Sequence, residues 1–590
     1  MTFTSFGDFA RYLETAGELH RVGLEVDPAL EITEIASRAL REGKPALLFE
    51  RVKGSPYPVV VNALASERRC ELALGRHPGA LGEDLVRFLD GAVPPRVASI
   101  LAHRKTAARF LHAPVRIVRS APSQEVTAEP DMDSLPVLTC WPGDGGRFIT
   151  LPQVVTYDPL SGRRNMGMYR MQVFDRRTAG MHWQIQKGGG FHYHRAERQG
   201  RPLEVAVAIG TDPALLLATV APLPENMDEA MFAGFLRGKR TEFVRGKTVS
   251  IAVPACAEFI LEGIVQPGER RMEGPFGDHF GHYSAAAPFP VFHASALTRR
   301  RNPVYPATVV GIPPMEDKFL GDATQMILSP LVRLLHAEVT AMWAYYEAGF
   351  HNLLVVAVEE RYAKEGMKTA LGLMGMSQLS LTKCIVLVTE GVDVRSFPAV
   401  LREIRRNYDP HFDFVMIPRV PLDTLDFTSA AMNLGSKMIL DATRKERPVV
   451  RRRTGSRSAG GVSALRGIDR RIAGGELIDE TMLVVSVRRD GRQVLRKLLA
   501  YPPFAAVPLI VTVSDDVDIR DPENTLWGIF TRFDCERDVL FAEQKLAGIC
   551  PVYGGAMGID ATWKPGYPAR LEMTGEVRRK VEERWDAYWR

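Results

Sequence analysis

The chain has 590 residues, 46% of them hydrophobic and 25% charged, with a formal net charge of +5. This length exceeds what a single hydrophobic core supports, so we expect two to four domains. The positive charge is weak for the length, and its densest basic run falls in an apparent linker, which argues against nucleic acid as a partner.

The cysteines and the apolar stretches indicate a cytoplasmic protein. No CxxC pair occurs, which argues against a zinc finger or a disulfide framework and favours a reducing compartment. The N-terminal residues carry acids and lack the basic and apolar regions of a signal peptide. No apolar stretch is long enough to span a bilayer. The six cysteines are Cys70, Cys140, Cys256, Cys384, Cys535 and Cys550.

Residues 1–115 are expected to form an α/β segment. Within it, residues 30–40 place their apolar side chains at helical spacing, and two short strands follow, ALLFERV and PVVVNAL. From about Phe148 the pattern changes to consecutive strands joined by tight turns, including ITLPQVVTY and NMGMYRMQVF. Such a series predicts an antiparallel sheet or barrel over residues 116–318. Further strands of it are expected at 205–209, 249–253 and 290–297.

An α/β layer domain is expected over residues 319–445, with a long helix at 323–346 that connects it to the preceding part. Three of its sequences return later in the same order. LVVAV is matched by LVVSV, IVLVTEGVDVR by IVTVSDDVDIR, and LGSKMILDATRK by YGGAMGIDATWK. We therefore predict a second copy at 481–590, after a linker at 446–480. The second copy has Ala556 where the first has Lys437.

The linker is rich in Arg, Ser and Gly, and it lacks the interleaved aromatic residues of a nucleic-acid site. A solvated connector is the favoured interpretation, with a contact to a peripheral membrane as an alternative. The last residues, GEVRRKVEERWDAYW, predict a helix. This helix is compatible with packing on a neighbouring subunit or on the duplicated domain.

Residues 273–284, EGPFGDHFGHYS, place two carboxylates and two histidines on a loop jointed by glycines. One interpretation is an acid/base pair, Glu273 and Asp278, with pKa values split by burial and mutual repulsion. The other is a glycine-rich turn whose acids cap backbone amides. A second group begins at NMGMYR, where Arg170 suits a carboxylate, and continues at HWQIQKGGG. Asn165 and Arg170 lie five residues apart, so a regular strand would point them to opposite faces.

These motifs resemble the UbiD family of prenylated-FMN-dependent decarboxylases, in order, over the first 445 residues. The matching stretches are GELHRVGLEVDPALEITEIASRAL, NMGMYR, RGKRTE, EGPFGDHFGHYS and LGSKMILDATRK. The tandem copy looks most like the long branch assigned to menaquinone biosynthesis by the futalosine route. The resemblance implies an α+β fold with a central split barrel that holds the flavin and a C-terminal α/β domain, here in tandem.

The resemblance also assigns residues. The catalytic network would be Arg170, Glu273 and Asp278, with Asp278 as the proton donor, which needs a raised pKa, and with Arg170 and Glu273 orienting the carboxylate. Prenylated FMN would supply the electron sink. A divalent metal, Mn²⁺ or Mg²⁺, would hold its phosphate, and K⁺ is a further candidate ion. The implied metal ligands are Asn165, Gln186 and Glu242, and the implied cofactor contacts are Asn165, Met168, Arg170, Gln186, Lys187, Glu242 and Lys437.

Gln186 departs from the family pattern, which has histidine at that position. An amide oxygen is a weaker ligand, so metal affinity is in question, and His182 or His192 are candidate substitutes. The resemblance predicts reversible decarboxylation of an aromatic acid, plausibly a dihydroxynaphthoate, by a homo-oligomer that receives its cofactor from a flavin prenyltransferase. The alternatives are another aromatic acid, or a non-catalytic cofactor-binding assembly subunit.

Overall fold

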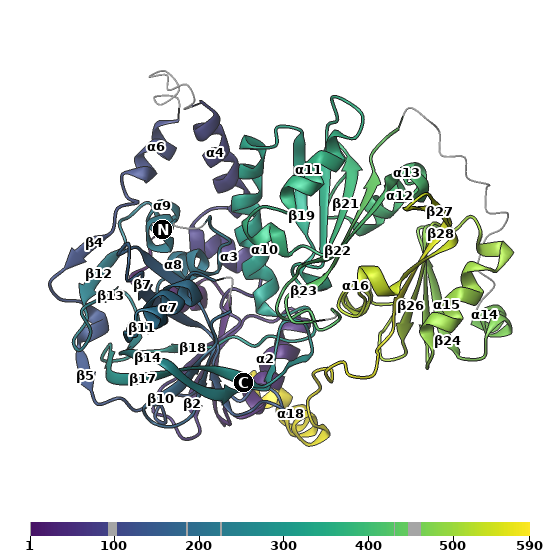
Figure 1. The fold of residues 1–590 in the computed structure, drawn as a ribbon. Helices are drawn as coiled ribbons and strands as arrows, with labels where there is room; N and C mark the ends of the chain where they lie inside the picture. The colour runs from purple at the N-terminus through teal and green to yellow at the C-terminus, as the bar shows by residue number, and fades with distance from the viewer. Residues whose placement is uncertain (1, 92–102, 185–186, 225–226, 430, 446–461) are drawn as a thin grey trace. The chain divides into compact units, whose positions relative to one another are not determined.

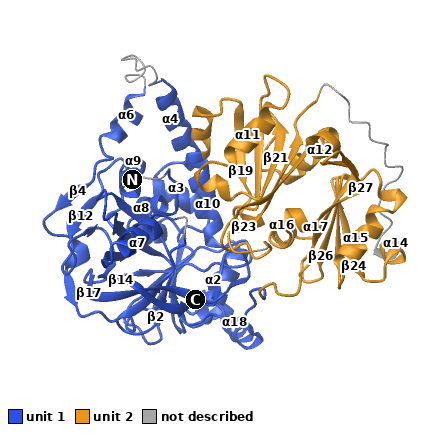
Figure 2. Ribbon diagram, in the orientation of Figure 1, with its two compact units in different colours: residues 1–328, 569–590 blue, residues 329–568 orange. Residues whose placement is uncertain are grey.

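The computed structural model describes residues 2–91, 103–184, 187–224, 227–429, 431–445 and 462–590. It divides into two compact units, which are coloured separately in Figure 2. Unit 1 comprises residues 1–328 and 569–590, and unit 2 comprises residues 329–568. Among the described residues, every helix is too short or too polar to cross a bilayer.

Unit 1 begins with a four-stranded sheet in the order β1-β2-β3-β18. Its strands are β1 (Leu19–Val26), β2 (Ala46–Val52), β3 (Val59–Val61) and β18 (Tyr305–Pro306). Because β1 and β2 are parallel, a crossover must join them, and the predicted helix α2 (Glu31–Arg41) supplies it. Four apolar α2 side chains at the predicted spacing are buried, namely Ile32, Ile35, Ala36 and Ala39, together with the polar Glu31, Thr33 and Ser37. The other helices here are α1 (Phe6–Thr15), α3 (Glu67–Leu74), α4 (Pro78–Gly91) and α6 (Arg104–Phe110).

The centre of unit 1 is a nine-stranded sheet in which every pairing is antiparallel, which confirms the predicted fold class. Its two longest strands pair along most of their length (Figure 1). The segment that joins them includes residues 273–284, which we call the acid loop. The strands are β5 (Val126–Ala128), β6 (Arg147–Ile149), β7 (Pro152–Tyr157), β8 (Arg164–Met168), β9 (Met171–Val173), β10 (Thr178–Met181), β11 (Leu203–Ile209), β14 (Phe259–Glu273) and β17 (Ala287–Arg299).

Three helices and two small sheets complete this part of the fold. The helices are α7 (Gly188–Arg198), α8 (Pro213–Val220) and α9 (Glu229–Arg237). A three-stranded sheet contains β4 (Arg116–Val118), β12 (Glu242–Arg245) and β13 (Ala252–Pro254), so the strand expected at 249–253 begins later and belongs to this sheet. The acid loop carries its own hairpin, β15 (Phe276–Gly277) with β16 (Tyr283–Ser284).

The long helix expected at 323–346 was wrong. Helix α10 (Glu316–Leu328) ends early and is followed by a 3-10 helix (Ser329–Leu334) and by strand β19 (Val339–Ala344). Pro330 lacks the N–H that continues an α-helix and clashes with the preceding turn, which ends α10 here. The Val339–Thr340 pair then starts an edge strand, as suits β-branched side chains.

Unit 2 contains two five-stranded sheets with the same topology, which confirms the predicted duplication. Their orders are β19-β20-β21-β23-β22 and β24-β25-β26-β28-β27. In each sheet the inner pairings are parallel and both edge strands are antiparallel. The first repeat has β20 (Leu353–Val358), β21 (Cys384–Thr389), β22 (Phe414–Pro421), β23 (Leu434–Ala442), α11 (Glu365–Leu373), α12 (Phe397–Asn407) and α13 (Pro410–Asp413).

The second repeat starts before the expected boundary. Helix α14 (Val462–Ile468) and strand β24 (Ile472–Ile478) occupy the second half of the expected linker, and β24 is an edge of the second sheet. Residues 446–461 lie outside the described residues. The other elements are β25 (Met482–Val487), β26 (Leu509–Ser514), β27 (Val539–Ala547), β28 (Cys550–Ala561), α15 (Gly491–Leu499), α16 (Pro522–Phe530) and α17 (Cys535–Asp538).

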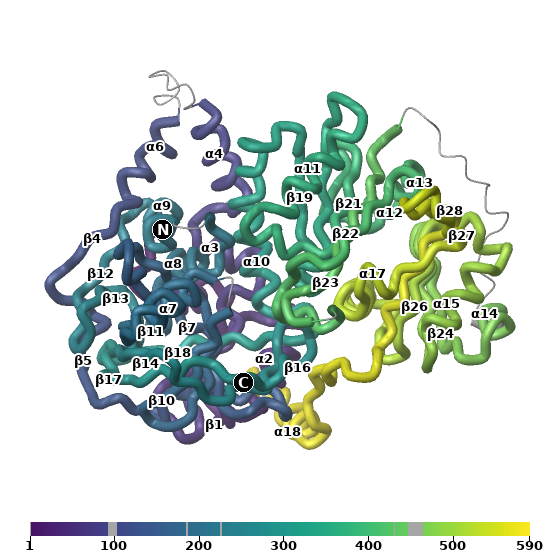
Figure 3. The backbone as a smooth tube through the Cα atoms, viewed as in Figure 1, coloured from purple at the N-terminus to yellow at the C-terminus, as the bar shows by residue number. Residues whose placement is uncertain are grey.

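The C-terminal helix α18 (Gly575–Tyr588) returns to unit 1 and lies beside α2 (Figure 3). The buried carboxylate of Glu31 accepts hydrogen bonds from Lys580 at 2.8 Å, Arg584 at 2.6 Å and the Tyr588 hydroxyl at 2.7 Å. Trp585 joins the core of unit 1. The helix therefore packs on the N-terminal segment, a contact that the sequence did not indicate.

Candidate active site

The three side chains predicted to form a catalytic network meet in unit 1. Arg170 lies between β8 and β9, and its Nε donates to Glu273 Oε1 at 3.0 Å. The same guanidinium donates to Asp278 and, at 3.0 Å, to Ser284 Oγ. Its charged end also lies 4.6 Å from the centre of the Phe276 ring. All three charged groups are nearly enclosed, with side-chain exposures of 9% for Arg170, 0% for Glu273 and 11% for Asp278.

The acid loop has this shape because a glycine turn and two contacts hold its backbone. Gly274 has φ +92, a conformation that side chains disfavour, and it turns the chain directly after Glu273. Asp144 Oδ1 accepts the Gly277 N–H at 2.8 Å. Gly277 itself lies against the Trp141 ring, where a Cβ would come within 2.2 Å of the ring carbon Cδ1. The loop is therefore a fixed platform for its two carboxylates.

Both carboxylates are held in the ionised form. Burial alone would raise the pKa of Asp278, but Arg170 and His279 outweigh it and hold that pKa well below its ordinary value. Burial likewise opposes the ionised form of Glu273, yet His182 and Arg170 lower its pKa. The raised pKa that the proton-donor role of Asp278 needs is therefore absent in this structure, because Arg170 and His279 outweigh the effect of burial.

His182 belongs to this network as well, although the sequence indicated it only as a substitute metal ligand. Its Nδ1 lies 3.0 Å from Glu273 Oε2, and its ring centre is 4.2 Å from that of Phe289. Burial and the nearby Arg170 lower the pKa of His182, so the ring is neutral. Its Nε2 is buried and has no hydrogen-bond partner among the described residues. A buried polar atom without a partner indicates a position where a ligand group is expected.

A second polar surface surrounds the N-terminus of α7. Asn165 Nδ2 donates to the Tyr169 hydroxyl at 3.2 Å, and that hydroxyl accepts the Gly189 N–H at 3.1 Å. A Cβ at Gly188 would lie 2.1 Å from Asn165 Oδ1, so only glycine allows the helix end to approach so closely. The Trp183 Nε1 is also buried without a partner among the described residues.

This surface fits a phosphorylated cofactor. The first turn of α7 is made of three glycines after Lys187, its N-cap residue, so backbone N–H groups and the helix dipole favour an anion there. Met168 ends β8 close to Asn165 in sequence. Gln186 lies outside the described residues. The structure therefore brings Asn165 together with the α7 N-terminus.

Glu242, the third implied metal ligand, lies in different surroundings. It begins β12 in the small three-stranded sheet, where its carboxylate is 40% exposed and 3.6 Å from Arg116. Glu229, which sequence reasoning missed, begins α9 and accepts the Met166 N–H at 2.9 Å, next to Asn165. Burial raises the pKa of Glu229 to about 7, although the Met166 N–H and the nearby Arg164 oppose the shift. The preceding Asp228, which caps α9, was the available signal that a helix begins here.

Lys437 lies on β23 in unit 2. Its Nζ donates to the carbonyl oxygens of Ser380 at 2.6 Å and Thr382 at 2.7 Å. Burial lowers its pKa to about 8. Among the described residues, no group of three or more His, Cys, Asp or Glu side chains forms a metal cluster.

Three sequence models of one enzyme family match most of the chain. They are described as the N-terminal, the Rift-related and the C-terminal domains of 3-octaprenyl-4-hydroxybenzoate carboxy-lyase. The first matches residues 10–89 and the second residues 116–313. The C-terminal model matches 318–442 and again 475–561, in agreement with the duplicated sheets.

Some relatives match nearly the whole chain, and others match about three quarters of it. A protein of Chlamydia trachomatis is 39% identical over 98% of both chains. A protein of Chlamydia pneumoniae, named as one subunit of a 4-hydroxybenzoate decarboxylase, is 36% identical over 96% of this chain and 95% of its own. A protein of Archaeoglobus fulgidus is 45% identical and covers 76% of this chain and 93% of its own.

Solved structures with the same fold lack the extra length. The UbiD-class enzyme HmfF from Pelotomaculum thermopropionicum, solved with FMN, is 30% identical with a TM-score of 0.64, and covers 78% of this chain and 98% of its own. The vanillic acid decarboxylase of Sedimentibacter hydroxybenzoicus is 25% identical with a TM-score of 0.68, over 80% of this chain and 99% of its own. The domain matches, the full-length relatives and the shared fold place this chain in the UbiD family of carboxy-lyases.

Proposed function

We propose that this chain is a prenylated-FMN-dependent decarboxylase that removes carbon dioxide, reversibly and without oxidation, from an aromatic carboxylic acid. The observation that carries the proposal is the buried Arg170 bonded to both Glu273 and Asp278. Because two carboxylates share this one cation, the carboxylate of an incoming substrate would compete with them for its hydrogen bonds. The non-catalytic alternative has no such observation in its favour.

The substrate carboxylate would take up part of the Arg170 charge. Arg170 already contacts Glu273 and Ser284, so it is oriented before the substrate arrives. Sharing Arg170 with a third anion weakens its hold on Asp278, and the pKa of Asp278 then rises toward the value that burial alone favours. Asp278 thereby becomes a proton donor in the complex, and the proton it gives replaces the departing carbon dioxide on the substrate carbon.

Prenylated FMN, when bound, supplies the electron sink for this chemistry. The α7 N-terminus and Asn165 would hold its phosphate end, while Trp183 and His182 offer buried polar atoms to it. HmfF has also been solved with prenylated FMN, in an evolved dimeric form that is 29% identical to this chain. A divalent metal, Mn²⁺ or Mg²⁺, would take Asn165 and Glu229 as ligands, with Gln186 in the position of the family's histidine and Glu242 outside this set.

The proposed substrate is a dihydroxynaphthoate-type acid, converted in the cytoplasm during menaquinone biosynthesis. The long, duplicated C-terminal region supports this branch. A hydroxybenzoate is the second candidate, because the full-length Chlamydia pneumoniae relative is named for 4-hydroxybenzoate decarboxylation. We also propose a homo-oligomer that receives its cofactor from a flavin prenyltransferase.

The test is anaerobic co-expression with a flavin prenyltransferase, followed by measurement of cofactor mass, metal content and carbon dioxide release. We expect prenylated FMN, one divalent metal and release from dihydroxynaphthoate that exceeds release from 4-hydroxybenzoate. The reverse preference would replace the substrate, and a protein that binds cofactor without releasing carbon dioxide from either acid would contradict the proposed activity.

The Glu273→Gln variant should lose at least about 100-fold in kcat, because it removes one of the two anions that orient Arg170 and the acceptor for His182. Glu269→Gln, on the same strand but 40% exposed, is the matched control. Equal turnover by the two variants would remove Glu273 from the mechanism. Cofactor content should be measured in both variants, so that loss of binding is separated from loss of chemistry.

A further inference from the structure

Asp278, the proposed proton donor, is hydrogen-bonded to a histidine to which the proposed mechanism assigns no role. His279 Nδ1 lies 2.9 Å from Asp278 Oδ1, and the His279 backbone N–H donates to the same oxygen at 2.9 Å. The His279 side chain is 22% exposed, twice the exposure of Asp278. The imidazole therefore connects a buried carboxylate with a more accessible part of the protein.

A second acidic residue is brought toward His279 through a shared aromatic ring. Trp141 lies against Gly277 on the acid loop and against Gly311, where a Cβ would come within 2.7 Å of the ring. Its Nε1 donates to the Val310 carbonyl at 2.9 Å. The segment that leads into α10 is thus fixed beside the acid loop. Asp317, in the first turn of α10, interacts electrostatically with His279 and with Asp278.

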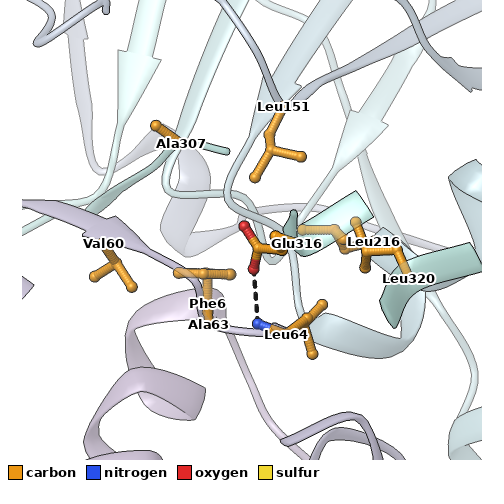
Figure 4. A pocket seen from close by; sticks show the side chains of 9 residues that line it. All are labelled: Phe6, Val60, Ala63, Leu64, Leu151, Leu216, Ala307, Glu316 and Leu320. Atoms are coloured by element: carbon orange, nitrogen blue, oxygen red, sulfur yellow. Dashed lines mark hydrogen bonds between the residues drawn. The ribbon is translucent and has the colours of Figure 1, made fainter. Parts of the chain in front are cut away.

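Asp317 is not the residue that anchors α10. That role belongs to Glu316, whose carboxylate accepts the Leu64 N–H at 2.7 Å among the apolar side chains of a small cavity (Figure 4). Removal from water raises the pKa of Asp317 to about 7, even though His279 opposes the shift. Asp317 therefore exchanges a proton close to neutral pH.

We propose that His279 and Asp317 form the route by which a proton returns to Asp278 after each turnover. This inference rests on the proposed decarboxylation, in which each carbon dioxide released requires one proton on the product. Asp278 gives its proton to the substrate carbon and becomes a carboxylate. The neutral His279 ring then transfers its Nδ1 proton to Asp278 Oδ1 while its Nε2 takes up a proton from Asp317 or from water, so the ring changes tautomer and stays neutral.

Such a route is needed because the surroundings of Asp278 oppose its reprotonation. Arg170, once the product has left, again favours the ionised form of Asp278. On the same side lie Glu273 and the neutral His182, while Asp144 holds the loop backbone and Glu316 precedes Asp317. Among these groups, His279 is the one in hydrogen-bond contact with Asp278 whose side chain is of the type that exchanges a proton near neutral pH.

The kinetic test uses the cofactor-loaded enzyme and the variants His279→Gln and Asp317→Asn. Glutamine keeps a donor for Asp278 but cannot relay a proton. We expect His279→Gln to lower kcat at pH 7 at least about 10-fold, to increase the solvent deuterium isotope effect, and to recover activity when free imidazole is added. Asp317→Asn should move the acidic limb of the kcat profile with pH. His293→Gln is the matched control, since His293 also pairs with a carboxylate, Glu269, at 2.7 Å.

A His279→Gln enzyme with unchanged isotope effect and no response to imidazole would overturn the route, even if its kcat were lower. A second measurement does not depend on activity. In the cofactor-free protein, the NMR titration of ring-labelled His279 should show a lower midpoint in Asp317→Asn, because an anion that favours the imidazolium has been removed. An unchanged midpoint would break the link between the two residues. If the wild type decarboxylates none of the aromatic acids, the proposed function fails, whereas this titration still decides whether the two groups are coupled.

Discussion

The two repeats of unit 2 have one topology, and both end their third parallel strand with the sequence Asp-Ala-Thr-x-Lys. In the first repeat Asp441 accepts the Thr443 hydroxyl at 2.6 Å and lies 2.9 Å from Lys445. In the second, Asp560 accepts the Thr562 hydroxyl at 2.6 Å. The second repeat thus retains the motif although it lacks a lysine at the position of Lys437. We infer that the motif stabilises the end of the strand.

The repeats differ in their buried cations. Lys383 is fully buried and bonds to Asp426 at 2.9 Å, and Pro508 occupies the corresponding position of the second repeat. The Lys383 Nζ also donates to the carbonyl oxygens of Phe530 at 2.7 Å and Phe533 at 3.0 Å, both in the second repeat. The second copy therefore completes the hydrogen bonds of the first, and it has an apolar core where the first has lysines.

The largest expected effect on stability comes from placing in the second repeat the lysine that the first repeat has at the corresponding position. Ala556 is 2% exposed in the apolar core of the second repeat. Ala556→Lys should destabilise unit 2 by on the order of 5 kcal/mol, because an ammonium group there has no partner and must be neutralised or expelled. Chemical denaturation followed by fluorescence measures this, with Ala556→Ser as the small-residue control. A loss under about 1 kcal/mol would mean that the second repeat accepts a lysine as the first does.

Removing the shared cation should have the next largest effect. Lys383→Ala leaves Asp426 and two carbonyl oxygens buried without their donor, and we expect a loss of about 3 kcal/mol. Lys545→Ala, an exposed lysine on β27, should change stability by less than about 0.5 kcal/mol. If both variants unfold at the same denaturant concentration, the first repeat does not depend on the second in the way described.

The smallest expected effect on stability concerns Asp441, the aspartate of the motif at the end of β23. Burial opposes ionisation of Asp441, but Lys445 and Lys364 outweigh it and lower its pKa. A carboxylate whose pKa is lower in the folded state stabilises the fold above its unfolded pKa, about 3.8, and this contribution disappears as the pH falls further. Asp441→Asn should therefore cost about 2 kcal/mol at pH 7 and less at pH 3. Thermal unfolding at both pH values measures this, and an equal loss at both would contradict the role of the charge.

Much of the site was predictable from local motifs. Two recognisable motifs carry Arg170, Glu273 and Asp278, and both belong to one antiparallel sheet, although β9 and β14 are separated in it by β10 and β17. The predicted conflict between Asn165 and Arg170 does not arise, because β8 ends at Met168 and Arg170 lies in the break before β9. What could not be predicted is the ionisation of Asp278, since its pKa depends on how one arginine is shared among several groups.

The sequence by itself determined the family, the duplication and the choice of Arg170, Glu273 and Asp278 as candidate site residues, because ordered motifs and strand patterns are properties of short segments. Only the tertiary structure decided that Glu229, and not Glu242, adjoins Asn165, and that α18 packs on α2. It also decided that Asp317 lies close enough to His279 to interact with it electrostatically. Each of these depends on contacts between segments far apart in the chain, where packing and burial select one neighbour among many of the same residue type.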